Sequence, residues 1–180
     1  AAIERFNDWA GGGRGGTIVL FGGLLGTLYS LLQFVCAPIL GSLSDRYGRR
    51  PILVMSVAGI ALSYLVWFFA GTFSLLVLAR LVGGIMSGNI STATAVVADV
   101  TGEENRSKGM AIIGVAFGLG FIVGPALGGL SAAVDLTRLW PGLAAYGVNP
   151  FSMPAVVALA LSLVNLAYVV ALFRETHPKG

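Results

Sequence analysis

A short stretch of the sequence combines one acidic side chain with three basic ones at close spacing. It covers residues 41–53 and reads GSLSDRYGRRPIL. The acidic residue is Asp45, and the basic residues are Arg46, Arg49 and Arg50. Guanidinium groups bind carboxylates in a fixed two-pronged geometry, so this cluster could hold neighbouring helix ends together and release them. The alternative is an anchor, in which the arginines only set the orientation of the chain across a membrane.

Long apolar stretches flank this charged segment on both sides. The 180-residue chain is 56% hydrophobic and 11% charged, and its mean hydropathy is +0.87. A helix needs about 20 mainly apolar residues to cross a bilayer. The composition therefore predicts an all-α membrane protein, in which the charged segment is a tight loop between two membrane helices. Gly41 and Gly48 permit a close turn, and Pro51 suits the start of the next helix.

Apolar segments with the length of membrane helices recur along the whole chain. The predicted spans are about 17–41, 51–71, 73–99, 109–132 and 154–173. Lys and Arg are concentrated in the short segments 41–53, 101–108 and 174–180, which all lie on one side of the membrane. The positive-inside rule predicts that this side is cytosolic, which makes residues 1–16 an extracytosolic loop.

Composition also weighs against other classes of protein. The net charge is +3, but the basic residues lie in short loops and form no continuous patch for nucleic acid. The single cysteine, Cys36, lies in an apolar stretch, so neither an internal disulfide nor a metal-ligand cluster is predicted. No set of nucleophile, base and orienting residue indicates an enzyme, and no cofactor is expected. The polar start at Ala1, without Met or signal peptide, predicts an internal fragment of a longer protein.

Polar side chains inside the predicted spans are candidates for a substrate cavity. Gln33 in the first span and Arg80 in the third are costly to bury, about 2.5–3.5 kcal/mol for an arginine near mid-membrane. On a helix, three hydroxyl residues fall within about 40° of Arg80; they are Ser87, Ser91 and Thr94. This polar stripe favours an anion-attracting cavity over snorkelling of Arg80 to the surface. Asn89 falls on the opposite face, where we expect it to bond a neighbouring helix.

Two further patterns suggest contacts between helices. The fourth span has glycines at 120, 124 and 128, with Pro125 and Gly129 beside them. Such spacing predicts a groove for close helix packing, and the proline predicts a bend. Asp99 ends the third span on the same side as the arginine cluster, so we expect an ion pair between them. None of the five predicted spans contains an Asp or Glu far from its ends that could carry a proton.

These motifs resemble those of a known family. Residues 41–50 fill every position of the signature between the second and third helices of the major facilitator superfamily. The spacing over residues 120–129 is similar to the fifth-helix motif of its drug/proton antiporter branch. Residues 77–84 resemble the fourth-helix signature around an arginine, with Gly83 where glutamine is frequent. Further stretches are similar to animal tetracycline transporter-like members; they are 21–26, 30–34 and 109–117.

The resemblance implies that residues 17–180 form helices two to six of a twelve-helix carrier, a part of its N-terminal half. Such carriers are secondary active transporters, some of them antiporters, that move small organic molecules by alternating access. Organic anions or drugs are the implied substrates. By the same analogy, Asp45 and the arginines latch a gate, residues 120–129 let helices slide, and Arg80 attracts the anion.

Other readings remain open at this stage. The chain could be a truncated, non-transporting membrane protein that acts as a regulator or scaffold. The substrate could be a sugar, because the signature at 41–50 is shared with sugar carriers. The predicted partners are a small-molecule substrate, the lipid bilayer and the missing remainder of the transporter. The predicted location is the plasma membrane or an internal membrane.

Overall fold

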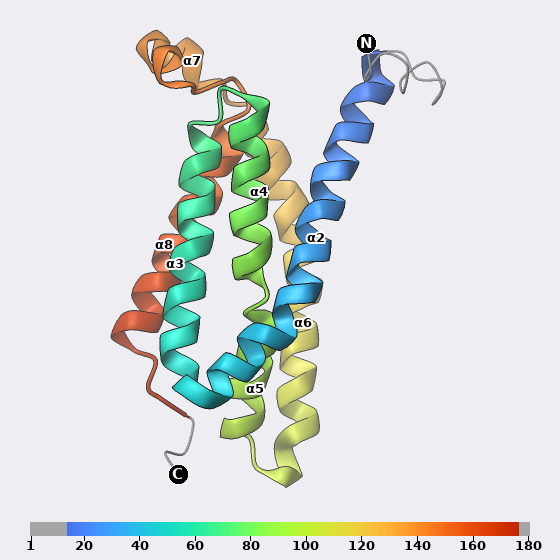
Figure 1. The fold of residues 1–180 in the computed structure, drawn as a ribbon, viewed down its shortest axis with the longest axis vertical. Coiled ribbons are helices and arrows are strands. Elements are labelled where there is room, and N and C mark those ends of the chain that lie inside the picture. Colours follow the sequence, from blue (N-terminus) through green and yellow to red (C-terminus); the bar gives the residue numbers. More distant parts are fainter. Residues whose placement is uncertain (1–13, 177–180) are drawn as a thin grey trace.

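The chain folds into a bundle of helices that run roughly side by side (Figure 1). The structure is a computed structural model that describes residues 14–176, with side chains from residue 20 onward. Within the described part, five helical stretches are long and apolar enough to cross a membrane. They are Leu20–Tyr47, Arg49–Phe68, Phe73–Val100, Glu103–Leu139 and Met153–Ala171. The all-α membrane fold is confirmed. The predicted extracytosolic loop 1–16 lies outside the described residues, except for 14–16, which are helical.

Seven α-helices and two short 3₁₀ turns make up the described part of the chain. In chain order they are α2 (Arg14–Tyr47), α3 (Arg49–Phe68), α4 (Phe73–Ser87), α5 (Ile90–Val100), η1 (Glu103–Asn105), α6 (Arg106–Ala132), α7 (Leu136–Leu139), η2 (Pro141–Tyr146) and α8 (Met153–Ala171).

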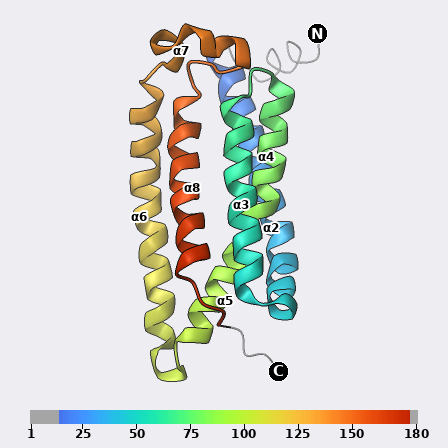
Figure 2. The same ribbon diagram turned by 90° about the vertical axis from the view of Figure 1, so that its left-hand side faces the viewer.

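The helices form an open rather than a closed bundle. α3 packs against both α4 and α8, and α2 packs against α4. Figure 2 shows α6 beside α8 on one side and α3 with α4 on the other. The buried core consists mainly of small side chains, such as Ser56, Ala61 and Ala79. Large apolar side chains point outward instead, with Phe34 79% and Phe121 78% exposed. An apolar outer face is what a lipid environment requires.

α2 and α4 approach each other closely, because Gly84 of α4 and Gly88 just after it face the α2 backbone. A β-carbon placed on Gly84 would lie 2.9 Å from the carbonyl oxygen of Tyr29, and one on Gly88 would lie 2.8 Å from the nitrogen of Ala37. Small residues let membrane helices approach in this way. By contrast, β-carbons on Gly120, Gly124, Gly128 and Gly129 would meet nothing within 4 Å among the described residues. The predicted groove is therefore open here, and its packing role remains a prediction.

The segment 41–53 is not the loop that its charges suggested. α2 continues to Tyr47 and α3 begins at Arg49, so Gly48 alone connects them, with a φ of 101°. The Gly48 N–H still donates to the carbonyl of Ser44 at 3.1 Å. Asp45 and Arg49 form an ion pair across this joint. Charged residues are compatible with helix at a membrane surface, so polarity alone did not mark a loop.

The third predicted span is interrupted near its middle. α4 ends at Ser87 and α5 begins at Ile90. In between, the N–H groups of Gly88 and Asn89 donate to the carbonyls of Ile85 and Met86, three residues back, at 3.4 and 3.3 Å. Such a turn is tighter than an α-helical one. The side chains of α5 are therefore rotated relative to the positions that one continuous helix would give them.

The segment between α6 and α8, expected to be a loop, forms an ordered cap over one end of the bundle. Figure 2 shows α7 lying across the tops of the long helices. The cap is tied to the end of α3, because Asn149 Nδ2 donates to the Ala70 carbonyl at 3.3 Å and Ser152 Oγ to the Phe68 carbonyl at 3.0 Å. Val148 is only 4% exposed beneath it.

Replacing Gly88 with valine tests the α2–α4 contact. The new side chain would overlap the α2 backbone, and overpacking of this kind costs about 1–3 kcal/mol. We expect a lower melting temperature of the full-length protein in detergent. Gly102→Ala is the control, because a β-carbon there meets nothing within 4 Å. Equal melting temperatures for the two variants would contradict the close approach.

Candidate functional site

Arg49 is the hub of a polar network at one end of the bundle, which we call the Arg49 end. Arg49 is only 6% exposed. Nε donates to Asp99 Oδ2 at 2.9 Å, and Nη1 donates to Ser44 Oγ at 2.8 Å and to Asp45 Oδ1. The ion pair expected between Asp99 and the arginine cluster is therefore present. Through one guanidinium group, the ends of α2, α3 and α5 are held together.

Glu175 joins the same network from the segment that follows α8. Its carboxylate accepts the backbone N–H groups of Arg49 at 2.8 Å and Arg50 at 3.0 Å. The first N–H groups of a helix have no partner inside the helix, and the positive end of the helix dipole favours an anion there. In return, Arg50 Nη2 donates to the Val170 carbonyl in the last turn of α8 at 2.7 Å. The start of α3 is thus hydrogen-bonded both to the last turn of α8 and to the segment that follows α8.

Sequence reasoning missed the role of Glu175. The signal was present, because an acidic residue follows the last span on the membrane side where α3 begins. Gly48 also has a second role that only the structure reveals. A β-carbon on it would lie 2.6 Å from Glu175 Oε2, so a larger residue would displace this carboxylate, while the positive φ itself favours glycine.

The other residues of the charged motif contribute in smaller ways. Arg46 is exposed, and its guanidinium lies 5.4 Å from the ring centre of Tyr47. Gly41 faces α5, where a β-carbon would lie 3.2 Å from Ser91 Oγ. The Ser91 hydroxyl donates to the Ala37 carbonyl of α2 at 2.6 Å. Ser91, predicted to line a cavity, lines the second of the two pockets described below and also takes part in packing α5 against α2.

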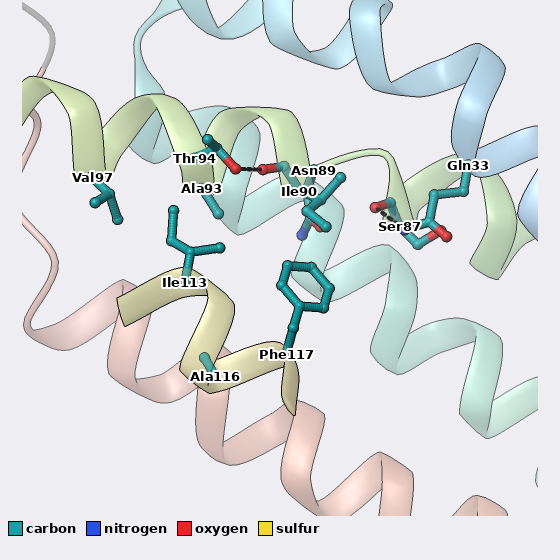
Figure 3. A pocket seen from close by; sticks show the side chains of 10 residues that line it. All are labelled: Gln33, Ser87, Asn89, Ile90, Ala93, Thr94, Val97, Ile113, Ala116 and Phe117. Atoms are coloured by element: carbon teal, nitrogen blue, oxygen red, sulfur yellow. Dashed lines mark hydrogen bonds between the residues drawn. The ribbon is translucent and has the colours of Figure 1, made fainter. Parts of the chain in front are cut away.

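A pocket of about 460 Å³ lies between α2, α5 and α6, as Figure 3 shows. It brings together three residues of the predicted cavity, namely Gln33, Ser87 and Thr94. The remaining lining residues are Asn89, Ile90, Ala93, Val97, Ile113, Ala116 and Phe117. We call this the neutral pocket, because none of these lining side chains carries a formal charge.

A second pocket of about 510 Å³ adjoins the first on the side of the Arg49 end. The two share Ile90 and Thr94, so they lie side by side on adjoining faces of α5. The second pocket contains charged groups, those of Arg49, Asp99 and Arg106. The polar network is therefore next to a space that continues toward the neutral pocket.

The expected position of Asn89 was wrong. On a continuous helix it would face away from Ser87 and Thr94, but the interruption between α4 and α5 turns it into the neutral pocket with them. Figure 3 shows its side chain between Ser87 and Phe117. Helical periodicity placed it wrongly because α4 and α5 are not one uninterrupted α-helix.

Arg80 does not line either of these pockets. Its guanidinium lies over the indole of Trp67, 4.1 Å from the ring centre, and 5.9 Å from that of Tyr29. Stacking on aromatic faces offsets part of the cost of a charge in a membrane helix. Trp67 is the next-to-last residue of α3, so Arg80 extends toward that end of the bundle, as the snorkelling alternative predicts. Its buried Nε has no hydrogen-bond partner among the described residues.

Comparison with known proteins identifies the family of this arrangement. The pattern described as "Major Facilitator Superfamily" matches residues 16–180. The chain belongs to the major facilitator superfamily. Family membership agrees with the resemblance of segment 41–50 and with the five membrane-spanning helices. The chain is therefore a multi-pass membrane protein.

Individual relatives are animal and bacterial members of the superfamily. The chain is 56% identical over 134 residues to major facilitator superfamily domain-containing protein 10 of Bos taurus, which covers 68% of this chain and 29% of the relative. It is 38% identical over 154 residues to the class B tetracycline resistance protein of Escherichia coli, covering 86% of this chain and 35% of that protein.

A solved structure agrees with the fold. The crystal structure of the human organic anion transporter MFSD10 (TETRAN) is similar with a TM-score of 0.77 and 38% identity. The match covers 97% of this chain and 37% of that one. The chain thus spans about a third of the length of the relatives that it matches.

Replacing Asp99 with asparagine tests the hub. The change removes one of the carboxylates that neutralise Arg49, while the hydrogen bonds to Asp45 and Ser44 can persist. Because Asp99 is partly exposed, we expect a loss of about 1–3 kcal/mol. The measurement is thermal unfolding of the full-length protein in detergent. Glu104→Gln, in the exposed turn η1, should leave the melting temperature unchanged, and an equal effect of both would contradict the hub.

Replacing Glu175 with glutamine tests the bond between α8 and α3. A neutral amide interacts more weakly with the first N–H groups of α3, and we expect a loss of about 1 kcal/mol. Glu104→Gln, in the exposed turn η1, is the matched control. Hydrogen exchange of the first turn of α3 should rise in the Glu175 variant alone. Unchanged exchange there would contradict the contact.

Proposed function

We propose that the protein containing this chain is a secondary transporter that moves small organic anions across a membrane by alternating access. Membership of the superfamily supports transport, and the match to an organic anion transporter supports the substrate class. The observation that carries the proposal is the buried Arg49 network beside two pockets that adjoin one another on α5. The proposed role is transport without catalysis.

The Arg49 network is suited to act as the latch of a gate. It joins the ends of α2, α3, α5 and the segment after α8 through ion pairs and hydrogen bonds rather than through a large apolar contact. Contacts of this kind near water can be exchanged for others at small cost, because their net free energies are modest. In the proposed cycle they hold this end closed in one state and separate in the other. By the positive-inside rule, this end faces the cytosol.

The remainder of the transporter is the partner that the open surfaces of this chain would meet. The face of α6 that carries Gly120, Gly124 and Gly128 has no neighbour within the described residues. We propose that helices of the missing part approach closely along this face and slide over it. Pro125 lies within this helix and would locally weaken its backbone hydrogen bonding.

The first test is flux of fluorescein, a fluorescent organic anion, into vesicles that contain the purified full-length protein. Wild-type protein should show saturable uptake. Asp45→Asn should lower the maximal rate at least tenfold at equal protein content, because one carboxylate of the latch is lost. Asp135→Asn, at the other end, should transport normally.

Two outcomes would contradict different parts of this proposal. No fluorescein uptake by the wild-type protein would contradict organic anion transport and favour a scaffold or regulator. Preferred uptake of neutral hexoses would replace the substrate class with sugars. Normal uptake by Asp45→Asn would contradict the latch and leave the arginines as an anchor.

A further inference from the structure

The neutral pocket offers one polar side chain whose hydrogen-bonding groups are unused. The hydroxyls of Ser87 and Thr94 donate to the carbonyls of Gly84 at 2.9 Å and Ile90 at 2.8 Å. Gln33 Nε2 donates, at the long distance of 3.5 Å, to the Ser87 carbonyl. The amide of Asn89 forms no hydrogen bond with any residue that the structure describes, yet it is half-buried and lies in the pocket (Figure 3).

Backbone geometry keeps Asn89 in this position. The tight turn at Gly88 and Asn89 separates α4 from α5, and Gly88 lies directly against the backbone of α2. Ser91, two residues later, is bonded to the Ala37 carbonyl of α2. The turn is thus held on both sides of Asn89. The Asn89 side chain is directed away from α2 toward Phe117 of α6.

The rest of the lining suits an uncharged molecular body. Apolar side chains such as Ile90, Ile113 and Phe117 form most of it, and no lining residue is charged. A volume of about 460 Å³ lies within the range of sites for drug-sized molecules, which are mostly apolar with few polar groups. Arg80 is not part of the pocket, because it stacks on Trp67.

We propose that the neutral pocket binds the uncharged, largely aromatic body of the transported organic anion, and that the Asn89 amide recognises a hydrogen-bonding group on that body. The anionic group of the same molecule is then held outside this pocket. The inference rests on the transport function proposed above and assigns selectivity within it. Asn89 is thus a specificity residue that recognises the shape and polarity of the body rather than its charge.

The test compares fluorescein uptake by three forms of the full-length protein: wild type, Asn89→Leu and Asn165→Leu. It is run at mildly acidic pH, where the carboxylate of fluorescein is ionised and its xanthene ring is uncharged. Leucine has the same branched arrangement of side-chain heavy atoms as asparagine, although its methyl groups are bulkier, and its side chain forms no hydrogen bond. We expect Asn89→Leu to raise KM about five- to tenfold with little change in maximal rate, since one hydrogen bond to the substrate is lost. Asn165 lies on the exposed side of α8 and outside the pocket, so its variant controls for removing an amide from a membrane helix.

The outcomes separate this inference from the proposed function. Fluorescein uptake with an unchanged KM in Asn89→Leu would overturn the role of Asn89 and leave the transport function intact. An equal rise of KM in both variants would also overturn it. Absence of uptake by the wild type would overturn the transport function, and the inference with it.

A labelling experiment tests the pocket without relying on transport by an altered Asn89. Ala93→Cys places a thiol on the pocket wall, in a protein whose native Cys36 is replaced by serine. A water-soluble maleimide should modify this thiol, and fluorescein should slow the reaction at least threefold. Gly102→Cys, in an exposed turn away from the pocket, should react at the same rate with and without fluorescein. No reaction at Ala93→Cys, or no protection, would overturn the binding site.

Discussion

A buried guanidinium must have both its charge and its donors satisfied, and the Arg49 end of the molecule is arranged around that requirement. Asp45 comes from α2 and Asp99 from α5, while Glu175 after α8 accepts the backbone N–H of Arg49 itself. Leaving such a charge without partners would cost several kcal/mol. Helix ends that are far apart in sequence are therefore required to meet at one residue. Because each partner must reach Arg49, the helix ends can meet here in only one arrangement. Because the contacts are polar, water can replace them when the helix ends separate.

Away from this junction, close backbone contacts replace the large apolar core of a soluble protein. Gly84 and Gly88 bring α4 against α2, and hydroxyls of α5 donate to α2 carbonyls, as Ser91 does to Ala37. In lipid, apolar side chains gain little by facing one another, so small residues and interhelical hydrogen bonds stabilise the packing. The interruption after α4 is part of this arrangement. It lets α5 follow α2 while Asn89 turns toward α6, which connects helix packing directly to the lining of the neutral pocket.

Much of this architecture could be predicted from sequence, because hydropathy and a dense motif are local signals. The membrane helices follow from runs of apolar residues, and the pairing of Asp99 with the arginine cluster from their shared membrane side, although only the structure identifies Arg49 as the partner. Three features were beyond that reasoning. The helical state of residues 41–47 was hidden because charge resembles a loop signal. Asn89 was misplaced because a tight turn resets helical phase without a proline to mark it. Glu175 was missed because the sequence shows only an acidic residue on the right side of the membrane, and its partners are backbone N–H groups that no side chain marks.

The single-residue connection between α2 and α3 restricts the insertions and deletions that this segment can accept. Gly48 alone joins the two helices, and one residue spans only about 3.8 Å between successive Cα atoms. Adding or removing a single residue in the last helical turn of α2, before Gly48, would turn the start of α3 by about 100° around the α2 axis. Arg49 would then point away from both Asp45 and Asp99, although every charged side chain would still be present. The number of residues in the joint is thus as strict a requirement as their chemistry, and insertions that a surface loop would tolerate are excluded here.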